Sequence, residues 1–185
     1  MREIRKRCAW VNLKNPLYVR YHDEEWGVPE HRDEKLYELL ILESFQAGLS
    51  WECVLNKREA FREAFDGFAL DRVCAYGEEK VDELMHNPGI IRNRRKIEAA
   101  IANSLVFRQI QGEFGSFDAY IWGFSAGETV REDYHLRTTS PLSDAISADL
   151  RRRGMRFVGS TIIYAYLQSI GMIFAHGREC DCAAQ

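Results

Sequence analysis

The sequence predicts an all-α fold, and three of its features carry this prediction. Most apolar residues recur at spacings of three and four, which is typical of helices with one buried face. Capping residues and glycines mark where such segments start and stop. The sequence has no series of alternating apolar and polar residues from which a sheet could be built. We therefore expect one domain over residues 1–185, with helices in a mixed packing joined by short loops.

The first strong helices are expected between residue 34 and about residue 65. Asp33 is a good N-cap for a helix over 34–47, and Ser50 is a good cap for the next one. Each helix has residues that fall on one side. On the first they are Leu36, Leu39, Leu40, Glu43 and Ala47, and on the second Trp51, Val54, Leu55, Arg58, Phe61 and Phe65.

Short helices are predicted over 70–76 and 78–86, followed by a longer one over 92–108. The inward face of the longer helix should consist of Ile97, Ala100, Ile101, Ser104 and Leu105.

Two more helices are predicted near the C-terminus. Ser140 as cap and Pro141 in the first turn start one of them, and Gly154 ends it. The last covers STIIYAYLQSIG, residues 160–171. The stretch 124–139 has no helical pattern and should be a loop or a small hairpin.

Glu43 is an anomaly on the first of these helices. It stands in an apolar stripe, at a position where a leucine would be expected. Glutamates are seldom fully buried without a partner, because burying an unpaired charge is costly. Trp51 follows eight positions later, beyond a Gly-Leu break. The sequence alone does not say what Glu43 faces.

Composition and charge limit the classes of protein to consider. Of 185 residues, 46% are hydrophobic and 29% charged, as in a folded globular protein. The chain has neither an apolar run of the roughly 20 residues that a membrane span needs nor an apolar segment of the kind found in secretory signals. We expect a cytoplasmic protein, whose five cysteines would be thiols or metal ligands rather than disulfides.

The net charge of −3 gives no direct sign of a nucleic-acid partner, but the basic residues are clustered. RNRRK (92–96) and RRRGMR (151–156) are compact basic patches. Such runs are usually solvated faces. Their position beside glycine-containing helix junctions makes phosphate contact a serious alternative.

Four cysteines and histidines near the chain ends could bind a metal ion. Cys8 and His22 lie near the start, and His176 and Cys180 form an H-x3-C pair near the end. Zinc favours such thiolate and imidazole ligands in a tetrahedron. The alternative is that they are unrelated surface residues. Four protein ligands would leave no position for water, so the ion would be structural and join segments 8–22 and 176–180.

Residues 78–108 form a second candidate site. A helix ends near His86, a Pro-Gly turn follows, and another helix begins. Gly89 allows close approach of the backbone, and the free N–H groups of the second helix would suit a phosphate together with Arg92 and Arg94. This pattern is either a helix–hairpin–helix DNA clamp or an ordinary turn between helices.

Six stretches, in order along nearly the whole chain, resemble the 3-methyladenine DNA glycosylase I family of bacterial base-excision enzymes. They are CAW (8–10), PLYVRYHDEEWGVP (16–29), LILESFQAGLSW (40–51), NPGIIRNRRKI (87–97), RGMRFVGSTI (153–162) and HGREC (176–180). The resemblance implies a helix–hairpin–helix glycosylase fold. It also implies one structural Zn²⁺ per chain, held by Cys8, His22, His176 and Cys180. Whether Cys182 could replace Cys180 is open.

The resemblance also implies an answer for Glu43, which lies in the family's base pocket and is the candidate catalytic residue. Trp51 would stack on the base, and Tyr21, Tyr18 and Trp10 would complete the pocket. Core packing is the alternative role for each aromatic residue, and it is a serious rival for Tyr18 and Trp10. A carboxylate and aromatic faces suit 3-methyladenine because N3-methylation makes this base cationic.

The resemblance further implies that the tip between the two helices, QAGLS (46–50), enters the DNA stack when the base is flipped out. Gly48 would permit close approach of the backbone and Leu49 would be an apolar wedge. A plain interhelical turn is the alternative. The expected partner is double-stranded DNA containing 3-methyladenine, bound by a monomer.

The reaction should stop at an abasic site, without lyase activity. Lyase relatives carry a Schiff-base lysine just after the hairpin, and the corresponding position here resembles Asn93. Many helix–hairpin–helix glycosylases also carry an essential aspartate beyond the second helix of the clamp, but this chain has no aspartate between Asp82 and Asp118. The general base is therefore not identified, and Glu43 could orient the base, polarise water, or do both. Two other functions stay open, a damage-binding module without catalysis and a zinc hydrolase acting on a small molecule.

Overall fold

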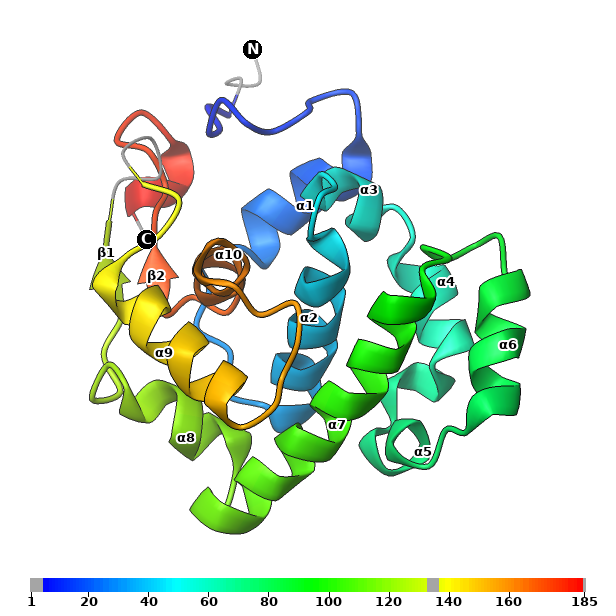
Figure 1. The fold of residues 1–185 in the computed structure, drawn as a ribbon. Helices are drawn as coiled ribbons and strands as arrows, with labels where there is room; N and C mark the ends of the chain where they lie inside the picture. The colour runs from blue at the N-terminus through cyan, green and yellow to red at the C-terminus, as the bar shows by residue number, and fades with distance from the viewer. Residues whose placement is uncertain (1–4, 133–136, 185) are drawn as a thin grey trace.

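The computed structural model describes residues 5–132 and 137–184, and the chain there is mostly helical (Figure 1). The first helices are α1 (Pro16–Glu24), α2 (Asp33–Gln46), α3 (Trp51–Leu55), α4 (Arg58–Ala64), α5 (Leu70–Cys74) and α6 (Glu78–His86). They are followed by α7 (Arg94–Phe114), α8 (Phe117–Gly123), α9 (Pro141–Arg152) and α10 (Ser160–Ser169). Short elements complete the chain: the 3-10 turns η1 (Asp66–Phe68) and η2 (Asp181–Ala184), and strands β1 (Val130–Arg131) and β2 (Ile173–Phe174). The predicted all-α class is confirmed.

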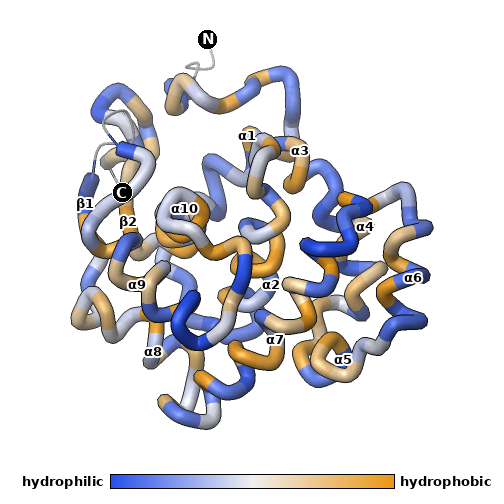
Figure 2. The backbone as a smooth tube through the Cα atoms, viewed as in Figure 1, coloured by the Kyte–Doolittle hydropathy of each residue, from blue (hydrophilic) through white to orange (hydrophobic). Residues whose placement is uncertain are grey.

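Helix α2 is the centre of the molecule, and α3, α7, α8 and α10 pack around it. Figure 2 shows hydrophobic residues along α2 and along α10, which is seen end-on. Every residue from Leu36 to Phe45 is buried, so α2 is enclosed on all sides rather than along one stripe. Its polar members are therefore the ones that need partners. Glu38 has them in Arg62 and Lys35, at 2.6 and 3.0 Å.

Asp33 does not cap α2 as predicted, because Arg32 occupies the N-cap position and Asp33 begins the helix. The Asp33 carboxylate instead accepts hydrogen bonds from the backbone N–H groups of Phe117 and Asp118, both at 2.8 Å. These groups start α8, where no carbonyl of the helix can reach them. Asp33 therefore stabilises the N-terminus of a helix that is distant in sequence.

The other predicted boundaries are partly confirmed. Ser50 caps α3 by accepting from the N–H of Cys53, but the expected continuous helix is divided into α3 and α4. Helix α7 extends beyond the predicted end at residue 108, as far as a left-handed Gly115 with φ of 87°. Leu105 was expected to point inward, but it is 38% exposed. The buried face of α7 passes through Ser104 and Phe107, which leaves Leu105 on the outer side.

The C-terminal helices follow their start and stop signals. Ser140 and Ser143 form a reciprocal capping box at the start of α9, and Gly154 has a φ of 105° just after its end. The stretch 124–139, predicted to be a loop or a small hairpin, does not form a hairpin in its described part. Strand β1 pairs in parallel with the distant β2, Val130 opposite Ile173. Residues 133–136 of that stretch lie outside the described residues.

Within the described residues, none of the helices combines the length and apolar character required to cross a membrane.

Candidate active site and metal centre

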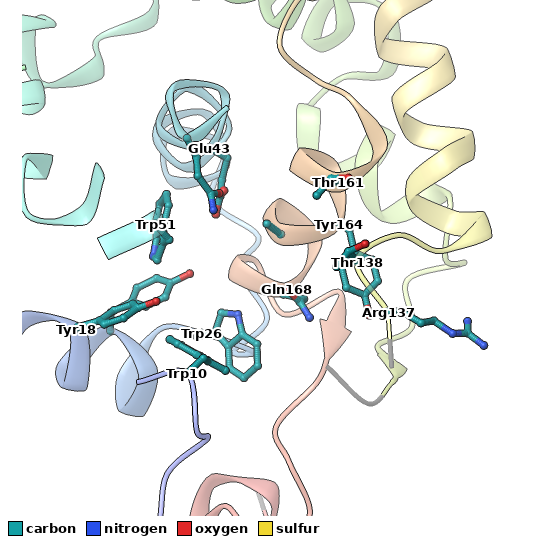
Figure 3. Close-up of a pocket in the computed structure, with 13 residues that line it drawn as sticks. Trp10, Tyr18, Trp26, Glu43, Trp51, Arg137, Thr138, Thr161, Tyr164 and Gln168 are labelled. Atoms are coloured by element: carbon teal, nitrogen blue, oxygen red, sulfur yellow. The ribbon is translucent and has the colours of Figure 1, made fainter. Parts of the chain in front are cut away.

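A cavity of about 260 Å³ opens between α10 and the group formed by α1, α2 and α3. In Figure 3, Glu43 points from α2 into this cavity, with Trp51 and Tyr18 on one side and Gln168 of α10 on the other. Arg137 points away from it, at the rim. The lining consists of Trp10, Tyr18, Tyr21, Trp26, Glu43, Gln46, Trp51, Arg137, Thr138, Thr161, Tyr164, Ala165 and Gln168. The five pocket residues predicted from the sequence therefore lie around one cavity.

Three polar atoms at this cavity have no hydrogen-bond partner among the described residues. They are Glu43 Oε2, Gln46 Oε1 and Trp51 Nε1, and only one other buried side-chain atom among the described residues, Arg58 Nε, shares this condition. Buried polar groups in folded proteins are nearly always paired, so such a concentration indicates a place for a ligand. The ligand would offer donors to Glu43 and Gln46 and an acceptor to Trp51.

Glu43 is the most unusual of these residues. Its side chain is 2% exposed, and burial raises its pKa well above the ordinary value of 4.5. Burial is the cause of this shift, and no cation of residues 5–132 or 137–184 is among its causes. The site therefore holds a carboxyl group whose ionised form would be stabilised by a positively charged ligand.

Six of the thirteen lining residues are aromatic. The centroids of Tyr21 and Trp51 lie 5.4 Å apart, and Trp10 lies 5.2 Å from Tyr18 and 4.8 Å from Trp26. Burial, with smaller effects of Glu52 and Glu43, raises the pKa of Tyr18 to about 12, so its phenol keeps its proton at neutral pH. Flat, electron-rich walls of this kind suit a planar cationic ring.

The sequence analysis missed several lining residues. Gln46 had a detectable signal, because it lies three positions after Glu43 and so on the same side of α2. Trp26 and the α10 residues Thr161, Tyr164 and Gln168 had none, because only the tertiary fold brings α10 opposite α2.

The four candidate metal ligands meet in a second site at the chain ends. The ligand atoms of Cys8, His22, His176 and Cys180 all lie within 4.8 Å of one another, and all four residues are buried. Cys180 Sγ is 3.5 Å from both His22 Nε2 and His176 Nδ1, and Cys8 Sγ is 3.7 Å from His176 Nδ1. A tetrahedral ion with ordinary zinc–ligand bonds requires sulfur–nitrogen separations of about 3.6 Å. The residues therefore fit such an ion.

The surroundings of the two histidines also fit a metal site. His22 Nδ1 donates to Asp23 at 2.8 Å, and His176 Nε2 donates to the carbonyl oxygen of Trp26 at 3.0 Å. Each ring thereby turns its other nitrogen toward the cysteines, as metal-bound histidines do. Burial lowers the pKa of both histidines, which favours the neutral imidazole that a metal requires.

Cys182 lies beside this centre but outside the group of four. Its sulfur is near His22 and Asp23 and accepts a hydrogen bond from Arg5 at 3.2 Å. The group of four contains Cys180, so the geometry favours Cys180 as the ligand.

The predicted hairpin is formed by α6, the turn 87–93 and α7. The Asn93 side chain caps α7 by accepting from the Lys96 N–H at 3.2 Å. A side chain at Gly89 would lie 3.0 Å from Ala60 Cβ, so glycine lets this turn pack closely. Arg92 is exposed, whereas Arg94 forms ion pairs with Glu78 and Asp82.

The turn between α2 and α3 connects two residues of the cavity lining, Gln46 and Trp51. Gly48 has a φ of 77°, a left-handed conformation that favours glycine, and a side chain there would meet no atom within 4 Å. Leu49 is 41% exposed. The two residues thus form an open apolar tip between Gln46 and Trp51.

Comparison with known proteins agrees with this geometry. The family model of methyladenine glycosylase matches residues 10–184. The chain is 41% identical to DNA-3-methyladenine glycosylase 1 of Escherichia coli, over 96% of each protein.

Two solved structures extend the likeness to the fold. A crystal structure of 3-methyladenine DNA glycosylase I superimposes with a TM-score of 0.92 at 42% identity, over 96% of this chain and 99% of that one. A Staphylococcus aureus structure, described as the structural basis of 3-methyladenine recognition, has a TM-score of 0.88 at 33% identity, over 91% and 92%. The chain therefore belongs to the methyladenine glycosylase family and is a glycosylase, a hydrolase of N-glycosyl bonds.

Proposed function

We propose that this protein flips 3-methyladenine out of double-stranded DNA and hydrolyses its N-glycosidic bond, leaving an abasic site. The carrying observation is the cavity itself, where a buried carboxyl group and two further unpartnered polar atoms lie among aromatic rings. N3-methylation makes the adenine cationic and activates it as a leaving group. Glu43 would pair with that positive charge, and Trp51 and Tyr21 would stack on the ring.

Hydrolysis of this glycosidic bond requires the protein mainly to bind the base and to let water reach the sugar. Because the leaving group is already activated, the site has to hold the extruded base and admit water to C1′. Glu43 orients the base, and its carboxylate can also polarise the water. Tyr18, Trp10 and Trp26 close the cavity on the side of the chain ends.

Two features favour a glycosylase without lyase activity. Asn93 caps α7 through its side chain and is no nucleophile. The nearby Lys96 is not part of the cavity lining, because its ammonium group is bonded to the carbonyl oxygens of Phe45 and Ala47. A lysine in the pocket would be needed to form a Schiff base with the sugar.

We propose that Zn²⁺ occupies the Cys8, His22, His176 and Cys180 site and has a structural role. Four protein ligands leave no coordination position for water, which disfavours a zinc hydrolase. The expected partner is alkylated duplex DNA, bound by a monomer in the bacterial cytosol. The apolar tip of Gly48 and Leu49 would enter the base stack, and Gly89, Arg92 and Arg94 would contact the DNA backbone.

The DNA-contact proposal predicts different effects for the two arginines. Arg92→Ala should weaken binding to methylated and unmethylated duplexes alike and flatten the salt dependence of log K by about 0.9, as the loss of one phosphate contact does. Arg94→Ala should have a smaller effect, because Arg94 must first leave Glu78 and Asp82. Binding isotherms at several salt concentrations measure both.

Arg108→Ala is the matched control, since Arg108 is exposed on the same helix but about 21 Å from Arg94 along its axis. It should leave the salt dependence unchanged. An affinity loss confined to methylated DNA would instead place Arg92 in base recognition.

Release of free base from alkylated duplex DNA tests the proposed function against a damage-binding module. A hydrolase liberates the base, and chromatography of the reaction detects it. Tight binding of alkylated DNA with every N-glycosidic bond intact would contradict the proposal.

A further inference from the structure

Lys96 is a buried lysine that takes no part in the proposed chemistry. It lies in the first turn of α7 and is 7% exposed. Its ammonium group donates to the carbonyl oxygens of Phe45, at 2.8 Å, and Ala47, at 2.6 Å. Buried ammonium groups normally have a carboxylate partner, and among the described residues no ion pair involves Lys96. Its role is therefore tied to these two carbonyl groups.

Both carbonyl groups belong to the end of α2. The last carbonyls of a helix have no partner within it, and they form the negative end of its dipole. The C-cap residue Ala47 has a φ of −47° and a ψ of 114°, and the left-handed Gly48 follows it, in a turn where the Gln46 carbonyl oxygen accepts from the Leu49 N–H at 2.6 Å. The Lys96 ammonium satisfies the carbonyl groups on either side of Gln46, those of Phe45 and Ala47, and so fixes the direction in which the chain leaves α2.

The chain that leaves α2 carries the parts that the proposed function needs. Gly48 and Leu49 follow Ala47 directly, and Trp51 begins α3 after them. Gln46, between the two bonded carbonyl groups, lines the cavity with an unpartnered Oε1. A shift at Ala47 would therefore move the apolar tip and two cavity residues together.

At its other end, Lys96 is fixed to the hairpin. Its N–H is bound by the Asn93 side chain, the residue directly after the exposed Arg92. The ammonium group also faces the ring of Phe157 at 5.9 Å. Phe157 has a φ of 55°, a strained value for an aromatic residue, and Asn103 holds the preceding residue by bonds to its N–H and carbonyl groups. The Lys96 side chain therefore connects the hairpin to the end of α2, and it packs against Phe157, whose backbone is held in place.

We propose that Lys96 is a positioning residue that fixes the 47–50 turn to the hairpin, so that the hairpin's grip on the DNA backbone places Leu49 in the base stack. This inference rests on the proposed function. It assigns to Lys96 a role in extruding the base and none in binding or hydrolysing it.

Lys96→Met tests the proposal, because methionine keeps the approximate length of the side chain and removes its charge and donors. Single-turnover excision of 3-methyladenine should slow about 10- to 100-fold on a fully paired duplex, since small misplacements of a positioned group have effects of this size. On a duplex with an abasic site opposite the lesion, where extrusion is easier, the loss should be about three-fold or less. Affinity for free 3-methyladenine should not change.

Lys57→Met is the matched control. Lys57 also donates to backbone carbonyl oxygens, but these are the oxygens of Pro88 and Gly89 in the hairpin turn and not those at the end of α2. Its loss should affect both duplexes equally. If Lys96→Met does not fold, Lys96→Gln provides the same comparison with a donor but no charge.

Equal slowing on the two duplexes, or no slowing on either, would overturn the role of Lys96. Failure of the unsubstituted protein to release any base would instead refute the proposed function, so the two failures are distinguishable.

Discussion

Cys180→Ser is expected to abolish binding of the proposed zinc ion and to lower the melting temperature by about 8–16 °C. The centre joins residues that are 168 positions apart in sequence, Cys8 and His176, and so removes much of the freedom of the unfolded chain. A ligand present at a thousand times its dissociation constant stabilises the folded state by about 4 kcal/mol. For a chain of this length each kcal/mol shifts the melting temperature by about 2–4 °C. Elemental analysis and a thermal melt of the same sample measure both effects.

Cys74→Ser is the control for this prediction, because Cys74 is half-buried on α5 and is not a member of the metal-binding group. It should keep the full metal content. Activity of Cys180→Ser should disappear only at temperatures where the protein unfolds, as a structural ion requires. Purified native protein without zinc, or a melting temperature that is unaffected by chelation, would contradict the metal assignment.

Glu43→Gln is expected to weaken 3-methyladenine binding about ten-fold. Glutamine keeps the shape of the side chain but offers a neutral hydrogen bond in place of a charge-assisted one, a difference of about 1.4 kcal/mol. Binding of neutral adenine should change less, so discrimination between the two bases should narrow. Titration of the free bases against both proteins measures the change.

The pH dependence of excision provides a second measure of the role of Glu43. Burial raises the pKa of Glu43 well above 4.5, and only the ionised form pairs with a cationic base. For the unsubstituted protein, kcat/KM should therefore fall as the pH is lowered through this raised pKa, and Glu43→Gln should lack that fall.

The stability of Glu43→Gln separates base recognition from a purely structural role. A carboxyl group with a raised pKa stabilises the fold fully below pH 4.5, and this contribution is lost as the pH rises toward the raised pKa. As the pH rises through this range, the free energy of unfolding of Glu43→Gln should increase relative to that of the unsubstituted protein, by at most about 1.4 kcal/mol per pH unit.

Glu38→Gln is the control, since Glu38 is also buried on α2 but is paired with Arg62 and Lys35. It should lower stability and leave base preference unchanged. If Glu43→Gln behaved in that same way, Glu43 would be a structural residue.

The sequence predicted the parts of the fold that depend on local pattern. Apolar periodicity and capping residues located α2, α7, α9 and α10, and Ser140 and Gly154 bound α9 as expected. The short helices α1 and α8 were not predicted, although the sequence contains their capping residues. Asn15 precedes Pro16 at the start of α1, and Ser116 caps α8. Their apolar patterns are too short to be distinguished from loops.

The interactions that the sequence could not predict join distant segments. The Asp33 carboxylate serves α8 instead of its own helix, and β1 pairs with a strand 43 positions away, Val130 with Ile173. Nothing in the neighbouring residues of Lys96 indicated that its ammonium group would reach the end of α2. Contacts of this kind depend on how the helices pack, which local propensity does not determine.

For the site, a residue type out of place proved more informative than periodicity. Glu43 was conspicuous as a carboxylate within an apolar helix, and the structure places it at the cavity without a partner for Oε2. The roles proposed for the surrounding aromatic residues came from the family resemblance, because a tryptophan or tyrosine in a core has the same local pattern as one in a pocket.

Comparing the release of two methylated bases tests the central claim most directly. Duplex DNA treated with a methylating agent contains both 3-methyladenine and 7-methylguanine, which are both cationic but present different edges. A small cavity with one buried carboxyl group should select by fit as well as by charge. We predict rapid release of 3-methyladenine and little release of 7-methylguanine, resolved by chromatography over a single time course. Equal rates of release for the two bases would contradict this account of the cavity.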